Sequence, residues 1–302
     1  MTIEDRIINE AARLGFCSAG FARVTPVQSA GIFQKWLDEG NNAGMDYLRK
    51  NERLRQNPAN LAGGAVTAIV VAASYQVNNE PGIGFATYAR GIDYHDVLRL
   101  KLDALAHFIS SITKTRTARV CVDSAPVAER DLAIAAGIGW RGRQGQVVNP
   151  DFGCCLLLGE LLTDIDLPPS APLENGCGSC ELCLKACPTG ALQQDGLVDC
   201  RKCISYLTIE HKGDFSPQQA ASLGGAVFGC DLCTAVCPWN RKTADRRIMP
   251  ELAPRPTPAP GEIMAMTPAG FSSRFTHTPI ARLGLDRLKR NASSAEPVRS
   301  RR

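Results

Sequence analysis

Two cysteine runs in the second half of the chain carry its most specific signal: Cys177-Gly-Ser-Cys180-Glu-Leu-Cys183-Leu-Lys-Ala-Cys187-Pro188 and Cys230-Asp-Leu-Cys233-Thr-Ala-Val-Cys237-Pro238. The first run has the C-x2-C-x2-C-x3-C-P spacing that is typical of bacterial ferredoxins with [4Fe–4S] clusters. The second run repeats this pattern without its first cysteine, because Val227 occupies that position. Zinc sites use separated cysteine pairs instead, so they fit this pattern less well. The two runs therefore predict a ferredoxin-like domain with two [4Fe–4S] clusters.

The ligands of these clusters follow from the crossed arrangement of two-cluster ferredoxins, in which the fourth cysteine of a run ligates the other cluster. This rule gives one cluster the ligands Cys177, Cys180, Cys183 and Cys237. The other cluster receives Cys187, Cys230 and Cys233, and it lacks one ligand. Cys200 and Cys203 are the nearest candidates, and spacing alone does not choose between them. We expect Cys17, Cys121, Cys154, Cys155 and also Cys200 to be ordinary core residues, because a free thiol behaves as a small apolar group.

Length and composition set the broad class of the protein. The chain has 302 residues, of which 44% are hydrophobic and 21% are charged. This length suggests about two domains, and this composition excludes wholesale disorder. We expect no membrane segment, since no apolar stretch approaches the roughly 20 residues that span a bilayer. The N-terminus shows no secretory leader, so we expect a cytoplasmic protein whose clustered thiols bind metal rather than form disulfides.

Apolar patterning predicts how the chain is divided. Periodicity predicts helices over 1–14, 28–39, 97–112 and 126–136, and apolar runs predict strands over 65–74, 118–122 and 154–162. This alternation predicts an α/β (α+β) domain over residues 1–166. A proline-rich linker over 167–173 leads to the ferredoxin-like domain over 174–242. Residues 243–302 are predicted to form a proline-rich connector, short helices and a basic tail, with the last dozen residues disordered.

Several short motifs occur in order along the chain. They are Val122-Asp-Ser-Ala-Pro-Val-Ala-Glu-Arg130, Ala136-Gly-Ile-Gly-Trp-Arg-Gly142, Asp151-Phe-Gly153, Leu158-Gly-Glu160, Cys203-Ile-Ser-Tyr-Leu-Thr-Ile-Glu210 and Gly229-Cys-Asp-Leu-Cys-Thr-Ala-Val-Cys-Pro-Trp-Asn240. Together they resemble the epoxyqueuosine reductase family over roughly residues 1–290. The resemblance implies an oxidoreductase with a cobalamin-binding domain followed by the two-cluster domain. It implies reduction of epoxyqueuosine to queuosine at the wobble position of tRNA, the last step of queuosine biosynthesis. Electrons would pass from an external donor through the two clusters to cobalamin.

The resemblance also assigns site residues. Cys203 matches the cysteine of the family's Cys-Ile-Ser-Tyr motif, so it would complete the second cluster. Asp123 matches the family's proton donor, and a carboxyl group desolvated by the corrin would have a raised pKa and could protonate the departing oxygen. From the residues alone, Asp123 could instead cap the following helix or pair with Arg130. The other positions in matching segments, expected to contact the cofactor, are Arg55, Tyr88, His95, Arg143, Gln144, Val147, Leu158, Ser205, Thr208 and Lys212.

The chain departs from many members of the family at its C-terminal end. Those members continue into a helical-repeat domain that helps to hold tRNA, and this sequence lacks the repeats. Residues 270–302 carry eight basic and two acidic side chains, including Arg287, Lys289, Arg290, Arg299, Arg301 and Arg302. This tail could bind tRNA phosphates in place of the repeats, or it could remain solvated. We expect a monomer.

Two other functions stay open on the sequence. A cobalamin-dependent reductive dehalogenase would also pair cobalamin with two clusters, but such enzymes carry a twin-arginine signal that this N-terminus lacks. A non-catalytic two-cluster electron carrier would not need the large upstream domain.

Overall fold

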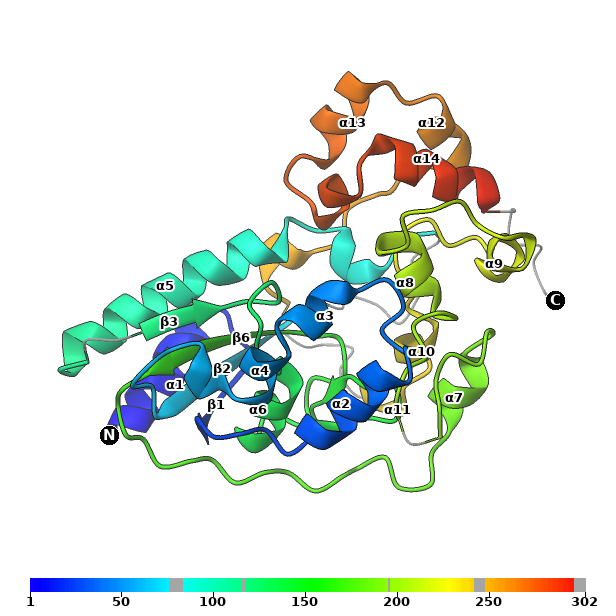
Figure 1. The fold of residues 1–302 in the computed structure, drawn as a ribbon. Helices are drawn as coiled ribbons and strands as arrows, with labels where there is room; N and C mark the ends of the chain where they lie inside the picture. The colour runs from blue at the N-terminus through cyan, green and yellow to red at the C-terminus, as the bar shows by residue number, and fades with distance from the viewer. Residues whose placement is uncertain (76–83, 116–117, 195, 242–247, 296–302) are drawn as a thin grey trace.

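The computed structural model describes residues 1–75, 84–115, 118–194, 196–241 and 248–295 (Figure 1). The strands are β1 (Ser18–Arg23), β2 (Thr67–Ser74), β3 (Ala118–Cys121), β4 (Trp140–Arg141), β5 (Val147–Val148) and β6 (Leu156–Thr163). The α-helices are α1 (Ile3–Arg13), α2 (Ala30–Asp38), α3 (Asp46–Lys50), α4 (Glu52–Gln56), α5 (Tyr94–Ile112), α6 (Glu129–Ala135), α7 (Leu182–Ala186), α8 (Ile204–Ile209), α9 (Pro217–Ser222), α10 (Leu232–Ala235), α11 (Pro238–Arg241), α12 (Pro260–Met264), α13 (Pro268–Phe275) and α14 (Leu285–Ser294). Short 3-10 helices span Pro58–Asn60, Thr87–Ala89, Pro250–Leu252 and Pro279–Leu283. Within these ranges, no helix combines the length and the apolar character needed to cross a membrane.

A four-stranded sheet forms the centre of the N-terminal part. Its strand order is β1-β2-β6-β3, and each neighbouring pair is antiparallel. Helices α1 and α5 contact one face and α6 contacts the other, so every residue of β2 is buried. The mixed α/β fold predicted from the sequence is confirmed. The continuous apolar run of β2 is typical of parallel strands, and here it arises in an antiparallel sheet because helices cover both faces.

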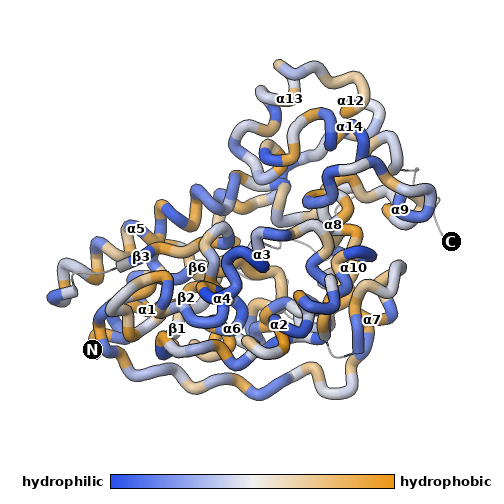
Figure 2. Tube along the Cα trace, in the orientation of Figure 1, coloured by the Kyte–Doolittle hydropathy of each residue, from blue (hydrophilic) through white to orange (hydrophobic). Residues whose placement is uncertain are grey.

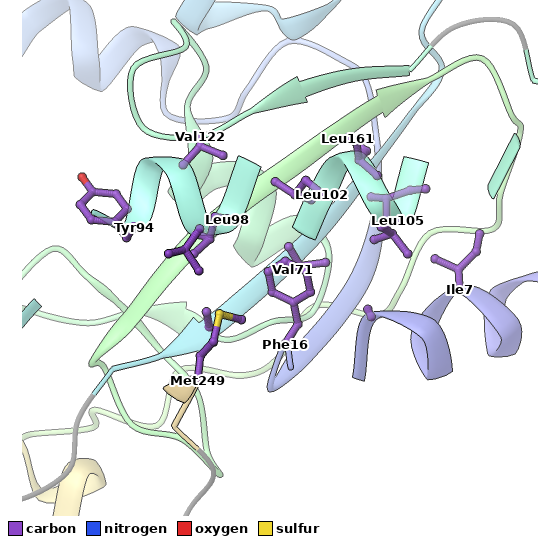
Figure 3. Packing of buried hydrophobic residues seen from close by; sticks show 14 of the residues in the cluster. Ile7, Phe16, Val71, Tyr94, Leu98, Leu102, Leu105, Val122, Leu161 and Met249 are labelled. Carbon is purple, nitrogen blue, oxygen red and sulfur yellow. The ribbon is translucent and has the colours of Figure 1, made fainter. Parts of the chain in front are cut away.

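Helix α5 packs against the sheet, and its first turn belongs to the candidate site. Figure 2 shows hydrophobic and hydrophilic residues alternating along this helix. Its apolar face places Leu98, Leu102 and Leu105 against the sheet, among Val71 and Leu161 (Figure 3). These three leucines are fully buried, and burying one such side chain contributes roughly 1.5–3 kcal/mol. This packing sets where the first turn of α5 stands relative to the ends of the strands.

The predicted helices and strands are present, with shifted ends. The helix predicted over 97–112 begins earlier, at Tyr94, because the Asp93 side chain accepts a hydrogen bond from the His95 N–H and caps the first turn. The helix predicted over 126–136 begins later, at Glu129. Residues 123–128 instead form a loop, which we call the Asp123 loop. Both shifts matter for the site, since they place Tyr94, His95 and Asp123 together.

The C-terminal helices α12, α13 and α14 gather at one end of the molecule (Figure 1). They share a core with Phe85 and Phe228. The prediction of disorder over the last dozen residues is wrong for 291–294, because α14 continues through Ser294 and buries Asn291 and Ala292. Residues 296–302, with Arg299, Arg301 and Arg302, lie outside the described residues, as does the predicted boundary at residue 242.

Two arginines of the predicted basic tail are held by backbone carbonyl groups. Arg287 Nη1 donates to the Ile209 carbonyl oxygen at 3.0 Å. Arg290 Nη1 donates to the His211 carbonyl oxygen at 2.9 Å, and its guanidinium group lies 4.2 Å from the ring centre of Phe215. These contacts dock α14 against the segment after α8. The two guanidinium groups therefore stabilise the fold and are poorly placed to grip tRNA phosphates.

Candidate active site

One cavity, of about 320 Å³, is lined by cysteine side chains from three segments of the chain. These are Cys187, which follows α7; Cys203, which precedes α8; and Cys230 and Cys233, which flank the start of α10. The same cavity is lined on its other sides by Tyr75, Tyr88 and Tyr94. The structure thus brings the predicted ligands of one cluster next to an aromatic surface of the N-terminal part.

A second cavity, of about 240 Å³, is lined by Cys177, Cys180, Cys183 and Cys237. The indole Nε1 of Trp140 donates to Cys177 Sγ at 3.4 Å, a contact of the kind that influences cluster potential. Helices α7 and α10 contact one another. Because they lie together, the last cysteine of each run reaches the cavity that the other run forms.

The structure separates the two candidates for the eighth ligand. Cys203 lines the first cavity, whereas Cys200 is not among its lining residues. The Cys200 thiol lies 3.9 Å from the Val198 carbonyl oxygen, within hydrogen-bonding reach for sulfur. No cysteine of the described residues forms a disulfide, and Cys121, Cys154 and Cys155 are buried in the core. Eight thiols around two cavities fit two clusters in number and placement.

A line of aromatic rings leads from the first cavity to Asp123. The ring centres of Tyr75 and Tyr88 lie 6.3 Å apart, those of Tyr88 and Tyr94 5.9 Å apart, and Tyr94 stacks on His95 at 4.1 Å. Burial raises the pKa of Tyr88 and of Tyr94 above the ordinary value, so these phenols keep their protons at neutral pH. They can donate hydrogen bonds but carry no charge.

Asp123 receives two hydrogen bonds at the end of this line. The Tyr94 hydroxyl donates to Asp123 Oδ2 at 2.8 Å, and His95 Nε2 lies 2.9 Å from the same oxygen. His95 Nδ1 lies 2.7 Å from Asp93 Oδ1. Since both ring nitrogens face carboxylate oxygens, the geometry favours a ring that carries both protons. The Asp123 side chain remains 52% exposed, so a substrate can reach it.

Neighbouring charges set the protonation of Asp123 and His95. Partial burial alone would raise the pKa of Asp123, but hydrogen bonds from His95 and Tyr94 and the charges of His95 and Arg282 hold it below the ordinary value. The rise in the pKa that we expect for Asp123 concerns a carboxyl group covered by a corrin, and it stays a prediction. Burial would lower the pKa of His95, but its bonds to Asp123 and Asp93 raise it to about 9. At neutral pH the proton of the pair is on His95.

The backbone of Asp123 has an uncommon conformation for a residue other than glycine. Its φ is +41°, and Ala43 is the other non-glycine residue with positive φ in the described part of the chain. The N-cap of α6 is Ala128. The structure therefore does not support the alternative in which Asp123 caps that helix.

The other predicted cofactor contacts divide into two groups. Tyr88, Gln144 and Ser205 line the first cavity, and Gln144 and Arg143 line the second. Gln144 Nε2 is buried and has no hydrogen-bond partner in the described part of the chain. Such a buried donor costs free energy unless it is satisfied by another group, so it is available to a bound molecule.

The remaining predicted positions lie away from the lining of both cavities: Arg55, Val147, Leu158, Thr208 and Lys212. Arg55 Nη1 donates to the Val127 carbonyl oxygen at 3.2 Å. Val147 and Leu158 pack into the core beside α6. The Thr208 hydroxyl donates to the Ile204 carbonyl oxygen and accepts from the Gly229 N–H. Lys212 is exposed.

Sequence reasoning missed Tyr94, Glu129 and Arg282 as members of this site. Glu129 lies inside a motif that the sequence singled out, and Tyr94 directly precedes the expected contact His95, but their partners come from other elements. Arg282 Nη1 lies 3.1 Å from His95 Nε2, although it is 187 positions away in the sequence. With both nitrogens protonated this is a close approach of two donors, and its effect on Asp123 is electrostatic. No local pattern could reveal it.

Known proteins resemble this chain in sequence and in fold. Residues 176–240 match the model of a 4Fe-4S double cluster binding domain, and residues 55–124 match the model described as epoxyqueuosine reductase QueG, DUF1730. The chain is 36% identical over 296 residues to the epoxyqueuosine reductase of Escherichia coli (strain K12), covering 93% of this chain and 77% of that protein.

Two solved structures agree with the sequence matches. A crystal structure of epoxyqueuosine reductase with an epoxyqueuosine-modified tRNA-Tyr stem loop has a TM-score of 0.88 and 30% identity, covering 97% of this chain and 80% of that chain. The Bacillus subtilis epoxyqueuosine reductase, in a structure with its catalytic aspartate loop swung out of the active site, has a TM-score of 0.86 and 30% identity, with the same coverage.

The two candidate ligands can be tested with a matched pair of variants. Cys203→Ser should lower the iron content of anaerobically reconstituted protein from about eight to about four per chain, because one cluster loses a thiolate. Cys200→Ser should keep about eight, because the Cys200 thiol lines neither of these two cavities. Iron and sulfide analysis with electron paramagnetic resonance of the reduced protein measures both. Equal iron loss in the two variants would rule out Cys203 as the sole eighth ligand.

Proposed function

The chain belongs to the epoxyqueuosine reductase family, and we propose that it reduces epoxyqueuosine to queuosine in tRNA with cobalamin and two [4Fe–4S] clusters as cofactors. Members of this family are oxidoreductases, and residues 176–240 supply the double-cluster domain. One observation carries the proposal. A single cavity is lined both by cluster thiols and by Tyr94, the tyrosine whose hydroxyl donates to Asp123.

The cysteines divide between the clusters according to the cavities that they line. One cluster takes Cys177, Cys180, Cys183 and Cys237, and the other takes Cys187, Cys203, Cys230 and Cys233. The second set borders the tyrosines. It is therefore the set whose cluster would stand nearer to the reaction, while the first set would stand nearer to an external electron donor.

The lining of the first cavity offers apolar and aromatic surface with polar groups among it, which fits part of a flat, mostly apolar cofactor. Tyr75, Tyr88, Leu156 and Leu157 supply apolar and aromatic surface, and Gln144 supplies the unpaired donor. Cobalamin bound there would supply a strongly reducing metal centre close to the substrate. Tyr88, Gln144 and Ser205 are the expected contacts that the cavity supports.

Asp123 and His95 hold the proton that the reaction needs. Removing an epoxide oxygen as water consumes two electrons and two protons, so a proton must be delivered at that oxygen. His95 is charged at neutral pH, and its Nε2 lies within hydrogen-bonding distance of Asp123 Oδ2. The Asp123 side chain is half exposed. We assign Asp123 as the proton donor to the substrate and His95 as the group that reprotonates it. The catalytic aspartate loop of the Bacillus subtilis enzyme supports this assignment.

The substrate follows from the relatives. The epoxyqueuosine reductase that was crystallised with a modified tRNA-Tyr stem loop aligns with 97% of this chain. We therefore infer that this chain also acts on tRNA carrying epoxyqueuosine, as a cytoplasmic monomer that receives electrons from an external donor.

Substitution of Asp123 tests its assigned role. Asp123→Ala should keep the clusters and the affinity for tRNA but lower turnover about 10²–10⁴-fold, the scale for losing a general acid. Asp123→Asn should be nearly as slow, because an amide cannot supply a carboxylic proton. Single-turnover assays with epoxyqueuosine-containing tRNA separate rate from binding. Asp103→Ala removes an exposed carboxylate of α5 and should behave as the native protein. Normal turnover of Asp123→Ala would remove Asp123 from the mechanism.

The pH dependence of turnover tests the proton on His95. The pKa of His95 is raised to about 9, so the pair carries its proton below this pH and loses it above. We expect kcat/KM to fall as the pH rises through about 9. His95→Gln should be slow across pH 7–9 and should lose this fall, whereas His107→Gln, at an exposed position of the same helix, should keep it. An unchanged pH profile in His95→Gln would contradict the assignment.

A further inference from the structure

The Asp123 loop rests on few contacts. Asp123 and Ser124 are exposed, and the backbone at Asp123 lies in the left-handed region that non-glycine residues seldom adopt. Such a conformation persists only where surrounding contacts impose it. The end of the loop is fixed, because Val127 is buried and its carbonyl oxygen accepts from Arg55. At the beginning of the loop, a separate contact must hold the backbone of Asp123 in this conformation.

Glu129 supplies that support from the first turn of α6. Its Oε1 accepts a hydrogen bond from the backbone N–H of Asp123. We propose that Glu129 is a positioning residue, whose carboxylate holds the Asp123 loop in the conformation that presents the Asp123 side chain to Tyr94 and His95. This inference deepens the proposed function and rests on it for its catalytic meaning.

The hydrogen bond from the Asp123 N–H to the Glu129 carboxylate, which we call the Glu129 latch, is well suited to hold the loop. A bond from an N–H group to a carboxylate is about twice as strong as one between neutral groups. The Glu129 bond holds the backbone of Asp123, whereas the bonds from Tyr94 and His95 hold its side chain. Loss of the Glu129 bond would therefore free the backbone that carries this side chain. In the Bacillus subtilis enzyme a catalytic aspartate loop is found swung out of the active site. A loop of this kind therefore has a second position in a relative.

The surroundings of Glu129 disfavour a charge on its carboxyl group. The groups that face it are Asp123 on the loop, Glu160 on β6, Cys121 on β3, Tyr94 on α5, Arg55 on α4 and the neighbouring Arg130. Burial and the charge of Asp123 raise the pKa of Glu129 to about 7, against the opposing effect of Arg130 and Arg55. The charge of Asp123 therefore works against the hydrogen bond that its own backbone N–H donates to Glu129.

Glu160 does not compete with Glu129 for the Asp123 N–H. Its side chain is fully buried, and neither carboxylate oxygen has a hydrogen-bond partner in the described part of the chain. A charge without partners in such a place is very costly, so Glu160 stays protonated.

The titration of His95 reports the loop without any use of catalysis. Its raised pKa depends on the bond to Asp123 as well as on Asp93, so it should fall when the loop leaves. We would label the histidines of the cluster-loaded protein with ¹⁵N and titrate His95 in the native protein, Asp123→Ala, Glu129→Ala and Glu129→Gln. Asp123→Ala gives the pKa of His95 in the absence of the Asp123 carboxylate. Glu129→Ala should move His95 most of the way to that value, and Glu129→Gln should move it part of the way, because an amide oxygen still accepts.

The second readout is turnover of the loaded enzyme. Glu129→Ala should lower kcat about 10-fold or more with little change in KM, the scale of losing one hydrogen bond to a charged group. Asp131→Asn is the matched control, since it removes a carboxylate of the same helix that pairs with Arg141, and it should titrate and turn over as the native protein. If Glu129→Ala does not fold, Glu129→Gln decides.

The outcomes separate this inference from the proposed function. A native titration of His95 in both folded Glu129 variants would overturn the latch. If Asp123→Ala kept its turnover while Glu129→Ala still shifted His95, the latch would stand and the catalytic role of Asp123 would fail.

Discussion

The hydrogen bonds that converge on the Asp123 carboxylate join the sheet to the cluster cavity, and the geometry of the site depends on them. Tyr94 and His95 come from the first turn of α5, and Asp123 comes from the loop after β3. The three residues meet because the leucines of α5 fix this helix against the sheet. A shift of α5 by one turn, about 5.4 Å, would break both bonds. Core packing far from the cavity thus sets the position of the Asp123 carboxylate.

The charges at this junction explain how the site can hold a proton yet release it. Without bound molecules, Tyr94, His95 and Arg282 keep Asp123 ionised, and the proton is stored on His95. A cofactor and substrate that cover the half-exposed carboxylate would remove water from it. Desolvation favours the neutral form of a carboxyl group and the neutral form of an imidazole. Binding should therefore move the proton from His95 to Asp123, toward the substrate.

Much of the architecture could be predicted from the sequence, because it depends on local patterns. The cysteine spacing indicated the double-cluster domain, which the matched family model confirms, and the apolar run of β2 indicated a strand buried on both faces. The antiparallel strand order could not be predicted, since β2 pairs with β6 across a separation of about 90 residues. The tertiary roles of Thr208 and Arg290 were missed for the same reason. Their hydroxyl and guanidinium groups bind carbonyl oxygens or N–H groups that the local sequence does not show.

The central claim is that this chain removes the epoxide oxygen of epoxyqueuosine in tRNA with the help of cobalamin. The most direct measurement is anaerobic incubation of cluster-loaded protein with cobalamin, a strong reductant and epoxyqueuosine-containing tRNA, followed by mass analysis of the nucleosides. We expect queuosine, with a mass lower by one oxygen atom, to form in the complete mixture and to be absent when cobalamin or the reductant is left out. No queuosine in the complete mixture would contradict the proposed reaction, and equal amounts without cobalamin would contradict the proposed cofactor.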